Sequence, residues 1–395
     1  MTYELIQRFP SLDRQGQFFE YLEPEFMIHG YYAFMRNRTN VLLLIGVTVF
    51  WVIALLSKLK FNGLVYGLDF GLFHPDGQLY SFRTLTMAGN SEVVSGSIVS
   101  DWYREHAFKL NSIDPKSLYF DTHPLWELYK SRVLYPILSV PFVALFGMQG
   151  MLVIPALSML ILMISIQIIG FKLDNKFLAF LISVLISISP VVSRWMFANI
   201  TDGLLTALAS LFVVTFLYVK NSNVFLITSG FIIILGSYTR ISVVQWLAVS
   251  LAIYLVKQKR NAILLGIVTI IFFIPSALRN IQTGILPNEE KGSLIDKPIQ
   301  LMVSMARVGF YEISQLVVLD RLLILLLVVA TIVSVFNLDR ASSKFFLLVL
   351  VALWITGAVN GTIGVNFRYQ LPLLPFMAYC IIESCKFSFI FKEKA

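Results

Sequence analysis

The sequence predicts an all-α polytopic membrane protein, and three observations lead to that class. The chain has 395 residues, of which 57% are hydrophobic and only 14% are charged, and soluble domains carry more charge than this. Apolar runs of about 15 to 23 residues recur along most of it, close to the length that a bilayer-crossing α-helix needs. The net charge of +8 then indicates cytoplasmic-loop lysines in contact with the lipid bilayer, and it does not indicate nucleic-acid binding.

Residues 1–40 are expected to form a cytoplasmic N-terminal segment. They are polar and aromatic, which predicts an interfacial helix and does not fit the basic and apolar regions of a cleavable signal peptide. Arg36 and Arg38 precede the first span, at about 41–57, and the positive-inside rule places them in the cytoplasm. A long first non-cytoplasmic loop, 58–131, follows and is expected to carry juxtamembrane helices.

The segment 133–147 decides the topology. It is apolar but only about 15 residues long and contains Pro136 and Pro141, so it is predicted to be a re-entrant or interfacial helix. If it does not cross, most of the later lysines fall in the cytoplasm. If it does cross, the assignment inverts and the positive-inside rule fails. Clearer spans follow at about 149–171, 177–193, 203–219, 223–239, 241–256, 261–278, 320–336, 344–360 and 369–391.

The prediction is therefore a transmembrane domain at 41–391 with both termini in the cytoplasm. It contains about 10–11 transmembrane helices, about ten of which are full spans. A second large outer loop is expected at 279–319, and 392–395 form a cytoplasmic tail.

Charged residues that are unusual beside a membrane gather on the predicted outer face. Arginine suits phosphate because its planar fork binds two oxygens at once, so the set fits a phosphate-bearing lipid head group. Snorkelling to the interface would account for any single arginine equally well. The set comprises Asp69, Asp76, Lys130, Arg132, Arg194, Asp202, Arg240, Arg279 and Arg368.

The two best-placed acids each have a structural alternative. Asp76 is followed four residues later by Tyr80, and the two share one face if a helix begins after Pro75. A carboxylate just outside a membrane helix is energetically costly, which favours a functional role for Asp76. The structural alternative is that Pro75, Asp76 and Gly77 form an ordinary turn. A low-dielectric membrane rim is expected to raise the pKa of Asp76. Asp202, beside Thr201, is either a site residue or a structural acid at the N-cap or in the first turn of a helix.

Five stretches on the predicted outer face follow a familiar order. They are an acidic motif at 73–80, a basic and proline motif at 129–136, an acidic span start at 199–205, a span-end arginine at 236–240, and Arg-Tyr-x-x-Pro-x-x-Pro at 368–375. Over about residues 40–390 this order resembles the GT-C superfamily of membrane glycosyltransferases. It is most similar to the family 39-like branch of protein O-mannosyltransferases and aminoarabinose transferases.

Two of these motifs depart from that family. Gly77 follows Asp76 where many relatives carry a second acid. A single proline follows Arg132 where close relatives have a Pro-Pro pair, and 121–124 matches that pair loosely.

The resemblance implies a GT-C-like bundle and an inverting hexosyl- or pentosyltransferase. Such an enzyme moves a sugar from a polyprenyl-phosphate donor to a lipid, glycan or protein acceptor. It implies an integral protein of the bacterial plasma (inner) membrane, acting on the non-cytoplasmic face. Asp76 would be the general base, with Asp69 as the alternative. Arg132, supported by Lys130, would hold the leaving phosphate. The remaining expected substrate-binding residues are Tyr80, Asp202, Arg240 and Arg368.

Other functions and ligands stay open at this stage. A lipid-linked saccharide polymerase, a transporter or flippase, and a non-catalytic GT-C relative are the alternatives, although a transporter is expected to show an internal repeat. The spacing of His74, His106 and His123 matches no metal signature, and Cys380 and Cys385 form neither a disulfide framework nor a zinc site. No cofactor is predicted, and a divalent metal ion is left open.

Overall fold

The computed structural model describes residues 38–60, 73–74, 76–106, 129, 131–240, 243–256, 258–282, 298–359 and 367–385. The chain divides into two compact units, Met1–Ile45 and Gly46–Ala395. Apart from the first helix, which begins in the first unit, everything below concerns the second unit. The expected interfacial helix in 1–40 and the tail 392–395 lie essentially outside the described residues.

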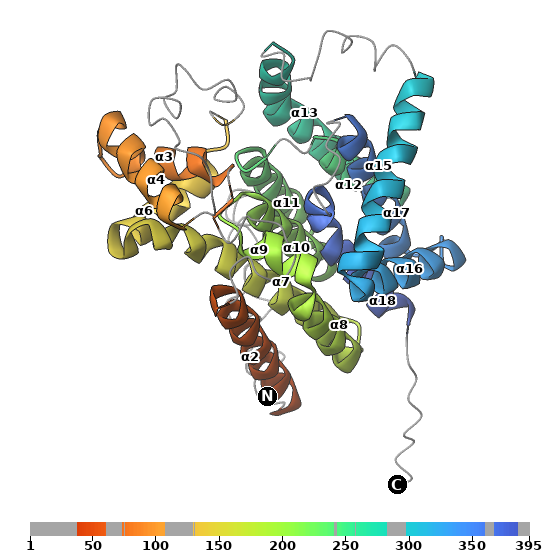
Figure 1. Cartoon of the computed structure of the whole chain (residues 1–395). Helices are drawn as coiled ribbons and strands as arrows, with labels where there is room; N and C mark the ends of the chain where they lie inside the picture. Colours follow the sequence, from red (N-terminus) through yellow and green to blue (C-terminus); the bar gives the residue numbers. More distant parts are fainter. Residues whose placement is uncertain are drawn as a thin grey trace, which may run out of the picture. The chain divides into compact units, whose positions relative to one another are not determined.

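The described residues form only helices, as the composition predicts, and no strand occurs among them. Two 3₁₀ helices, η3 and η4, accompany the α-helices labelled in Figure 1. In chain order the elements are α2 (Arg38–Lys60), α3 (Gly77–Met87), α4 (Glu92–His106), α6 (Leu134–Phe146), η3 (Gly147–Leu152), α7 (Val153–Lys172), α8 (Lys176–Ile188), α9 (Pro190–Phe197), α10 (Asp202–Tyr218), α11 (Ser222–Ser237), α12 (Val243–Leu255), α13 (Lys259–Gln282), α15 (Pro298–Leu319), α16 (Arg321–Phe336), α17 (Ala341–Val359), η4 (Arg368–Leu373) and α18 (Leu374–Ser384).

Several of these helices are apolar enough to be membrane-associated. Two helical stretches, Arg38–Lys58 and Leu134–Lys172, have the length and composition to cross a bilayer, and α8 with α9 would make a third. The second stretch is 39 residues long. At 1.5 Å per residue it measures about 58 Å, roughly twice the hydrocarbon thickness, so only part of it need span. It is interrupted by η3, which begins at Gly147 with φ of 60°.

The predicted span 177–193 is broken in the structure. Helix α8 ends at Ile188, and α9 continues at an angle of 73°. The Ser189 hydroxyl accepts from the Val192 amide and thereby caps α9. Ser189 also donates to the buried Asp320 carboxylate, which accepts from the Leu323 amide at the start of α16. Ser189 thus caps α9, Asp320 caps α16, and the hydrogen bond between these two residues ties the bend to the start of α16.

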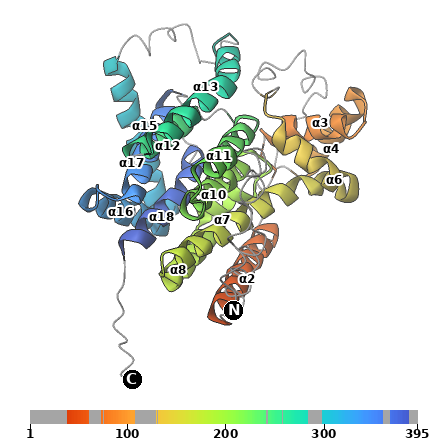
Figure 2. The same ribbon diagram turned by 180° about the vertical axis from the view of Figure 1, so that it is seen from behind.

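Helix α10 lies at the centre of the packing that positions the site. It packs against α7, α11, η4 and α18, and Figure 2 shows the same helices from behind. Phe212 on α10 makes edge-to-face contacts with Trp246 on α12 and Phe345 on α17. Aromatic side chains in such pairs contribute about 0.5–1.5 kcal/mol beyond their buried area, so this cluster holds the C-terminal helices against α10.

The turns between helices contact one another in two separate groups. In the first, Asn175 donates to the carbonyl oxygen of Cys385, Arg340 to that of Glu383, and Lys344 to that of Leu255. In the second group, the segment around Asp76 meets the start of α10 and η4, and the Leu134 amide donates to Tyr238. The first group contains turns predicted to be cytoplasmic, and the second contains turns predicted to be outside.

The two predicted outer loops carry helices. The first loop contains α3 and α4, which pack against each other, while α6, at the end of that loop, packs on α3 (Figure 2). The segment 279–319 contains α15, a 22-residue helix that packs against α17. The part of the sequence predicted as a second loop is thus largely helical where it is described.

Candidate functional site

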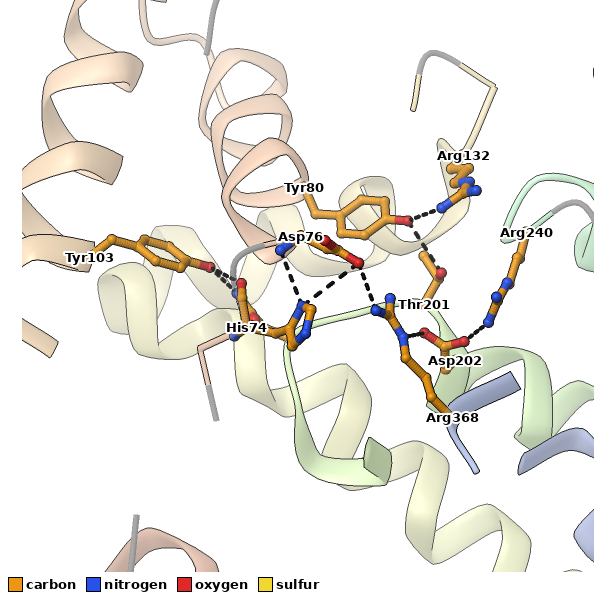
Figure 3. A network of polar contacts seen from close by, with 10 residues as sticks. His74, Asp76, Tyr80, Tyr103, Arg132, Thr201, Asp202, Arg240 and Arg368 are labelled. Carbon is orange, nitrogen blue, oxygen red and sulfur yellow. Dashed lines mark hydrogen bonds and ion pairs between the residues drawn. The ribbon is translucent and has the colours of Figure 1, made fainter. Parts of the chain in front are cut away.

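Four charged side chains form one continuous network at the second group of turns, those predicted to be outside. We call it the carboxylate–guanidinium network. The Arg368 Nη1 atom lies 2.7 Å from the Asp76 Oδ2 atom, and its Nε donates to the Asp202 Oδ2 at 3.0 Å. The other Asp202 oxygen pairs with Arg240. Figure 3 shows the resulting order Asp76, Arg368, Asp202, Arg240. Residues from four separate segments therefore meet at one place, and Arg368 and Asp202, for example, are 166 positions apart in the sequence.

Neither carboxylate caps its own helix. Asp76 occupies the N-cap position of α3, and Asp202 is the first residue of α10, but no side-chain capping bond is made at either helix start. The helix expected after Pro75 is present, and Asp76 and Tyr80 both contact site residues. The N-cap alternative raised for Asp202 is therefore wrong, whereas Asp202 is an acid in the first turn of α10, and its side chain pairs with Arg240 and Arg368.

The four side chains of the network differ in exposure, and that of Arg240 is 10% exposed. The Asp76 side chain is 33% exposed, whereas that of Arg368 is 7% exposed and that of Asp202 is 0% exposed. A buried charge is stable only when it is paired and hydrogen-bonded, and Asp202 meets that condition through two guanidiniums. Asp76 is accordingly the acid that a molecule arriving from outside can reach.

Arg132 approaches the same site from the opposite side of Tyr80. Its Nη1 atom donates to the Tyr80 hydroxyl at 3.0 Å, and its guanidinium lies 5.0 Å from the Tyr129 ring centroid. The Tyr80 hydroxyl also lies 3.3 Å from the Thr201 hydroxyl. Among the described residues no carboxylate pairs with Arg132, and its buried Nε has no hydrogen-bond partner. Arg132 is therefore a cation with unused capacity to bind an anion.

A frame of hydrogen bonds holds the start of α3 against the start of α10. The Asn199 side chain accepts from the His74 amide at 2.8 Å and donates to the Tyr103 hydroxyl at 2.6 Å, and Tyr103 donates to the His74 carbonyl. Gly77 is required here, since a Cβ at that position would lie 2.2 Å from the Asn199 side chain. This frame fixes the backbone on both sides of Asp76.

Aromatic rings cover two arginines of the network. The Arg240 guanidinium lies 3.9 Å from the Tyr369 ring centroid, and the Arg368 guanidinium lies 5.4 Å from that of Trp195. Such cation–π contacts are strengthened where water is excluded. Trp195 is carried by α9, so the bend after α8 contributes directly to the site.

The pKa of Asp76 is lowered, contrary to the sequence-based expectation. Burial is the largest single effect and would raise this pKa, but Arg368, His74 and Arg132 together outweigh it, and Arg368 contributes most among the three. The prediction that the membrane rim raises this pKa is therefore wrong, because an arginine distant in sequence stabilises the anion. Asp76 is ionised at neutral pH and is available as an acceptor.

His74 is held neutral beside that carboxylate. Its Nδ1 atom accepts from the Asp76 amide at 3.1 Å, which leaves the proton of the neutral ring on Nε2. Burial lowers the pKa of His74 from 6.5 to about 4, Asp76 opposes the shift, and Arg368 and Arg194 reinforce it. His74 therefore acts as an acceptor at neutral pH and makes no ion pair with Asp76.

Acid should destabilise the protein through His74. Because the folded pKa is about 4 and the unfolded value is 6.5, the unfolded chain binds the proton more readily in this window. The free energy of unfolding should fall by up to about 3 kcal/mol as pH drops from 6.5 to about 4. Thermal unfolding at stepped pH measures the slope. His74→Gln, which keeps an acceptor for the Asp76 amide, should flatten it; an unchanged slope in that variant would assign the effect to another group.

Glu312 supports Arg368 through the backbone. This buried carboxylate on α15 accepts from the amide of Phe367 at 2.6 Å, and Phe367 has a left-handed φ of 66°. A left-handed conformation is unfavourable for a residue with a Cβ and persists where contacts enforce it. Arg368 follows at once, so Glu312 helps to set the direction in which that guanidinium leaves the backbone.

The two substitutions at Glu312 should separate hydrogen bonding from charge. Glu312→Ala leaves the buried Phe367 amide without this acceptor, which costs about 1–3 kcal/mol of stability. Glu312→Gln keeps an acceptor oxygen and should retain most of the wild-type stability and the activity proposed below. Thermal unfolding and activity of both variants test this, and equal losses in the two would show that the charge of Glu312 matters more than its acceptor.

The structure brings together most of the residues predicted for the site. Asp202, Arg240 and Arg368 form the network with Asp76. Tyr80 and Arg132 lie beside it, because the Tyr80 hydroxyl accepts from Arg132 and lies next to the hydroxyl of Thr201, the residue before Asp202. Asp69 and Lys130 lie outside the described residues. Five further residues that contribute to the site were not assigned to it from the sequence: His74, Asn199, Thr201, Trp195 and Glu312. Three of them, His74, Asn199 and Thr201, are polar residues within three positions of a predicted acid, and that proximity was the available signal. Trp195 and Glu312 carried no such signal.

In the part of the chain that the structure describes, no three His, Cys, Asp or Glu side chains gather as metal ligands would. Comparison of the chain with protein-family models, with curated proteins and with solved structures gives no match. The class of protein must therefore be inferred from the site itself.

Proposed function

We propose that the protein is a membrane glycosyltransferase with a GT-C-like arrangement of about ten spans. It would transfer a sugar from a polyprenyl-phosphate donor to an acceptor hydroxyl on the non-cytoplasmic face. The observation that carries the proposal is the convergence of one reachable carboxylate with three arginines drawn from separate segments. A carboxylate beside a surplus of guanidiniums suits a reaction that removes a proton and releases a phosphate.

The proposed reaction is a single displacement. Asp76 takes the proton of the acceptor hydroxyl while that oxygen bonds to the anomeric carbon of the sugar, and the bond from that carbon to the phosphate oxygen breaks with inversion. The electron pair leaves with the polyprenyl phosphate. Arg132, which lacks a carboxylate partner among the described residues, stabilises the charge on that phosphate. Asp202 is fully buried and pairs with both Arg240 and Arg368, so we assign Asp202 and Arg240 to positioning Arg368.

The contacts between turns support the proposed topology. If helices cross a bilayer in alternation, turns on one side can touch only turns on the same side. The contacts given above respect this rule under the assignment in which α6 does not cross, because cytoplasmic turns meet cytoplasmic turns and outer turns meet outer turns. Reporter fusions at residues 174 and 258 should both report the cytoplasm. A non-cytoplasmic signal at both positions would reject this topology.

The transfer reaction is tested with the full chain in membranes. Membranes that contain the protein are supplied with a panel of polyprenyl-phosphate-linked hexoses and pentoses labelled in the sugar. We expect one donor to release polyprenyl phosphate and to pass its label into a lipid, glycan or protein fraction. Membranes without the protein provide the baseline. If no donor of the panel is consumed above that baseline, the proposal fails.

A further inference from the structure

A cavity lies among the turns of the predicted cytoplasmic group, and none of its lining residues belongs to the site around Asp76. Its volume is about 490 Å³, and it opens between the turn that joins α10 to α11 and the turn that joins α12 to α13. Three cations line it, namely Lys220, Lys259 and Arg260. No carboxylate is among its described lining residues. The cavity is therefore strongly basic without an internal counter-charge.

The three cations lie at or just before the N-terminal ends of two helices. Lys259 and Arg260 are the first residues of α13, and Lys220 lies two residues before the start of α11. Neither helix has an acidic residue in its first turn. The N-terminal end of a helix carries partial positive charge, so cations placed there repel the helix dipole and an anion placed there is stabilised.

The contacts that the cations do make leave their charge uncompensated. Arg260 donates to the Asn223 side-chain oxygen at 3.2 Å, and the Lys259 ammonium lies 5.8 Å from the Tyr254 ring centroid. Both partners are neutral. Asn261, which is only 5% exposed, lines the cavity beside them, and its side-chain oxygen accepts from Ser222. The cations therefore lie next to the polar side chain of Asn261, which is held by its hydrogen bond with Ser222.

The cavity wall on the helix side is apolar. Phe216 and the buried Phe225 line it and contact each other, with their ring centroids 6.1 Å apart. Tyr218, Tyr254 and Leu255, on the helices that lead to the cavity, are exposed. A ligand that fits this cavity would have an anionic group that binds among the cations and an apolar chain that lies along these helices. That combination describes an anionic lipid better than a free ion.

We propose that this cavity binds the phosphate of an anionic phospholipid on the face opposite the site around Asp76. A juxtamembrane Lys or Arg attracts anionic lipid, and basic pockets between membrane helices hold lipid head groups. The two rings provide the surface against which the glycerol and upper acyl chain lie. The binding does not depend on the transfer reaction proposed above, and it uses none of the residues of that site.

The test compares the full-length protein in nanodiscs of pure phosphatidylcholine with nanodiscs that contain increasing phosphatidylglycerol. We expect phosphatidylglycerol to raise the unfolding temperature of the wild type in a saturable manner. The triple variant Lys220→Gln, Lys259→Gln, Arg260→Gln should need about tenfold or more phosphatidylglycerol for the same rise. The matched control is Lys172→Gln with Lys176→Gln, because both lysines lie in the same group of turns but do not line the cavity.

A second variant guards against a triple variant that fails to fold. Lys259→Glu would place a carboxylate inside the cavity and an acid in the first turn of α13. It should be at least as stable as the wild type in phosphatidylcholine and should lose the response to phosphatidylglycerol. A full response in either cavity variant, or an equal loss in the control pair, would overturn the proposal in favour of general surface attraction. Equal stabilisation by inorganic phosphate in phosphatidylcholine would overturn the lipid as the source of the anion.

Discussion

Replacing Asp76 with Asn is expected to lower sugar transfer by about 10²–10⁴-fold while leaving the amount of folded protein unchanged. The substitution keeps the size of the side chain and removes its ability to take a proton. Asp76 is also the most exposed member of the network, so its loss disturbs packing little. Release of polyprenyl phosphate from the labelled donor, measured in membranes with matched protein levels, gives the rate.

The control for this experiment is Asp101→Asn. Asp101 lies in the same predicted outer loop, on α4, with a side chain that is 62% exposed and that pairs with Arg104 on its own helix. We expect wild-type transfer from this variant. Near-normal transfer by Asp76→Asn would remove Asp76 from the role of base and make Asp69 the next residue to test.

The largest effect on stability is expected at Asp202. Asp202→Asn removes the charge that pairs with both Arg240 and Arg368, and breaking a buried ion pair by removing one partner costs about 3–5 kcal/mol. Arg368 retains Asp76, so most of the penalty comes from the Arg240 guanidinium left behind. Thermal unfolding of the purified protein in detergent measures the loss.

A second substitution should reverse part of that loss. In the double variant Asp202→Asn with Arg240→Met, the unpaired guanidinium is gone and its stem is replaced by an apolar chain, so the double variant should unfold at a higher temperature than Asp202→Asn alone. Asp339→Asn, at an exposed turn, serves as the neutral control. Additive losses in the double variant would show that the pair is not coupled as the contacts indicate.

Much of this architecture could be predicted from local features of the chain. The apolar runs predict the helices because crossing a bilayer requires length and hydrophobicity, both of which are read without knowing any contact. The limits of α10, α11 and α16 in the structure lie within about two residues of the predicted spans. The site residues were found in the same way, since a charge inside or beside an apolar run is costly and therefore conspicuous.

The break between α8 and α9 shows where that reasoning stops. Residues 177–193 are apolar throughout most of their length, and hydropathy alone makes them one span. The bend depends on Ser189, which caps α9, and on Asp320, a carboxylate from a helix that starts more than a hundred residues later. The hydropathy of residues 177–193 gives no information about a hydrogen-bond partner that is distant in the sequence.

The sequence by itself determined that this is a helical protein with apolar helices and a set of charged residues expected on one face. The tertiary structure alone decided how those charges are used: Asp202 pairs with two arginines and caps nothing, and Arg368 lowers the pKa of Asp76. The physical reason is that hydropathy belongs to a segment, whereas the partner of a buried charge is set by packing between segments. Arg368 and Asp202, 166 positions apart, become neighbours only when η4 packs on α10.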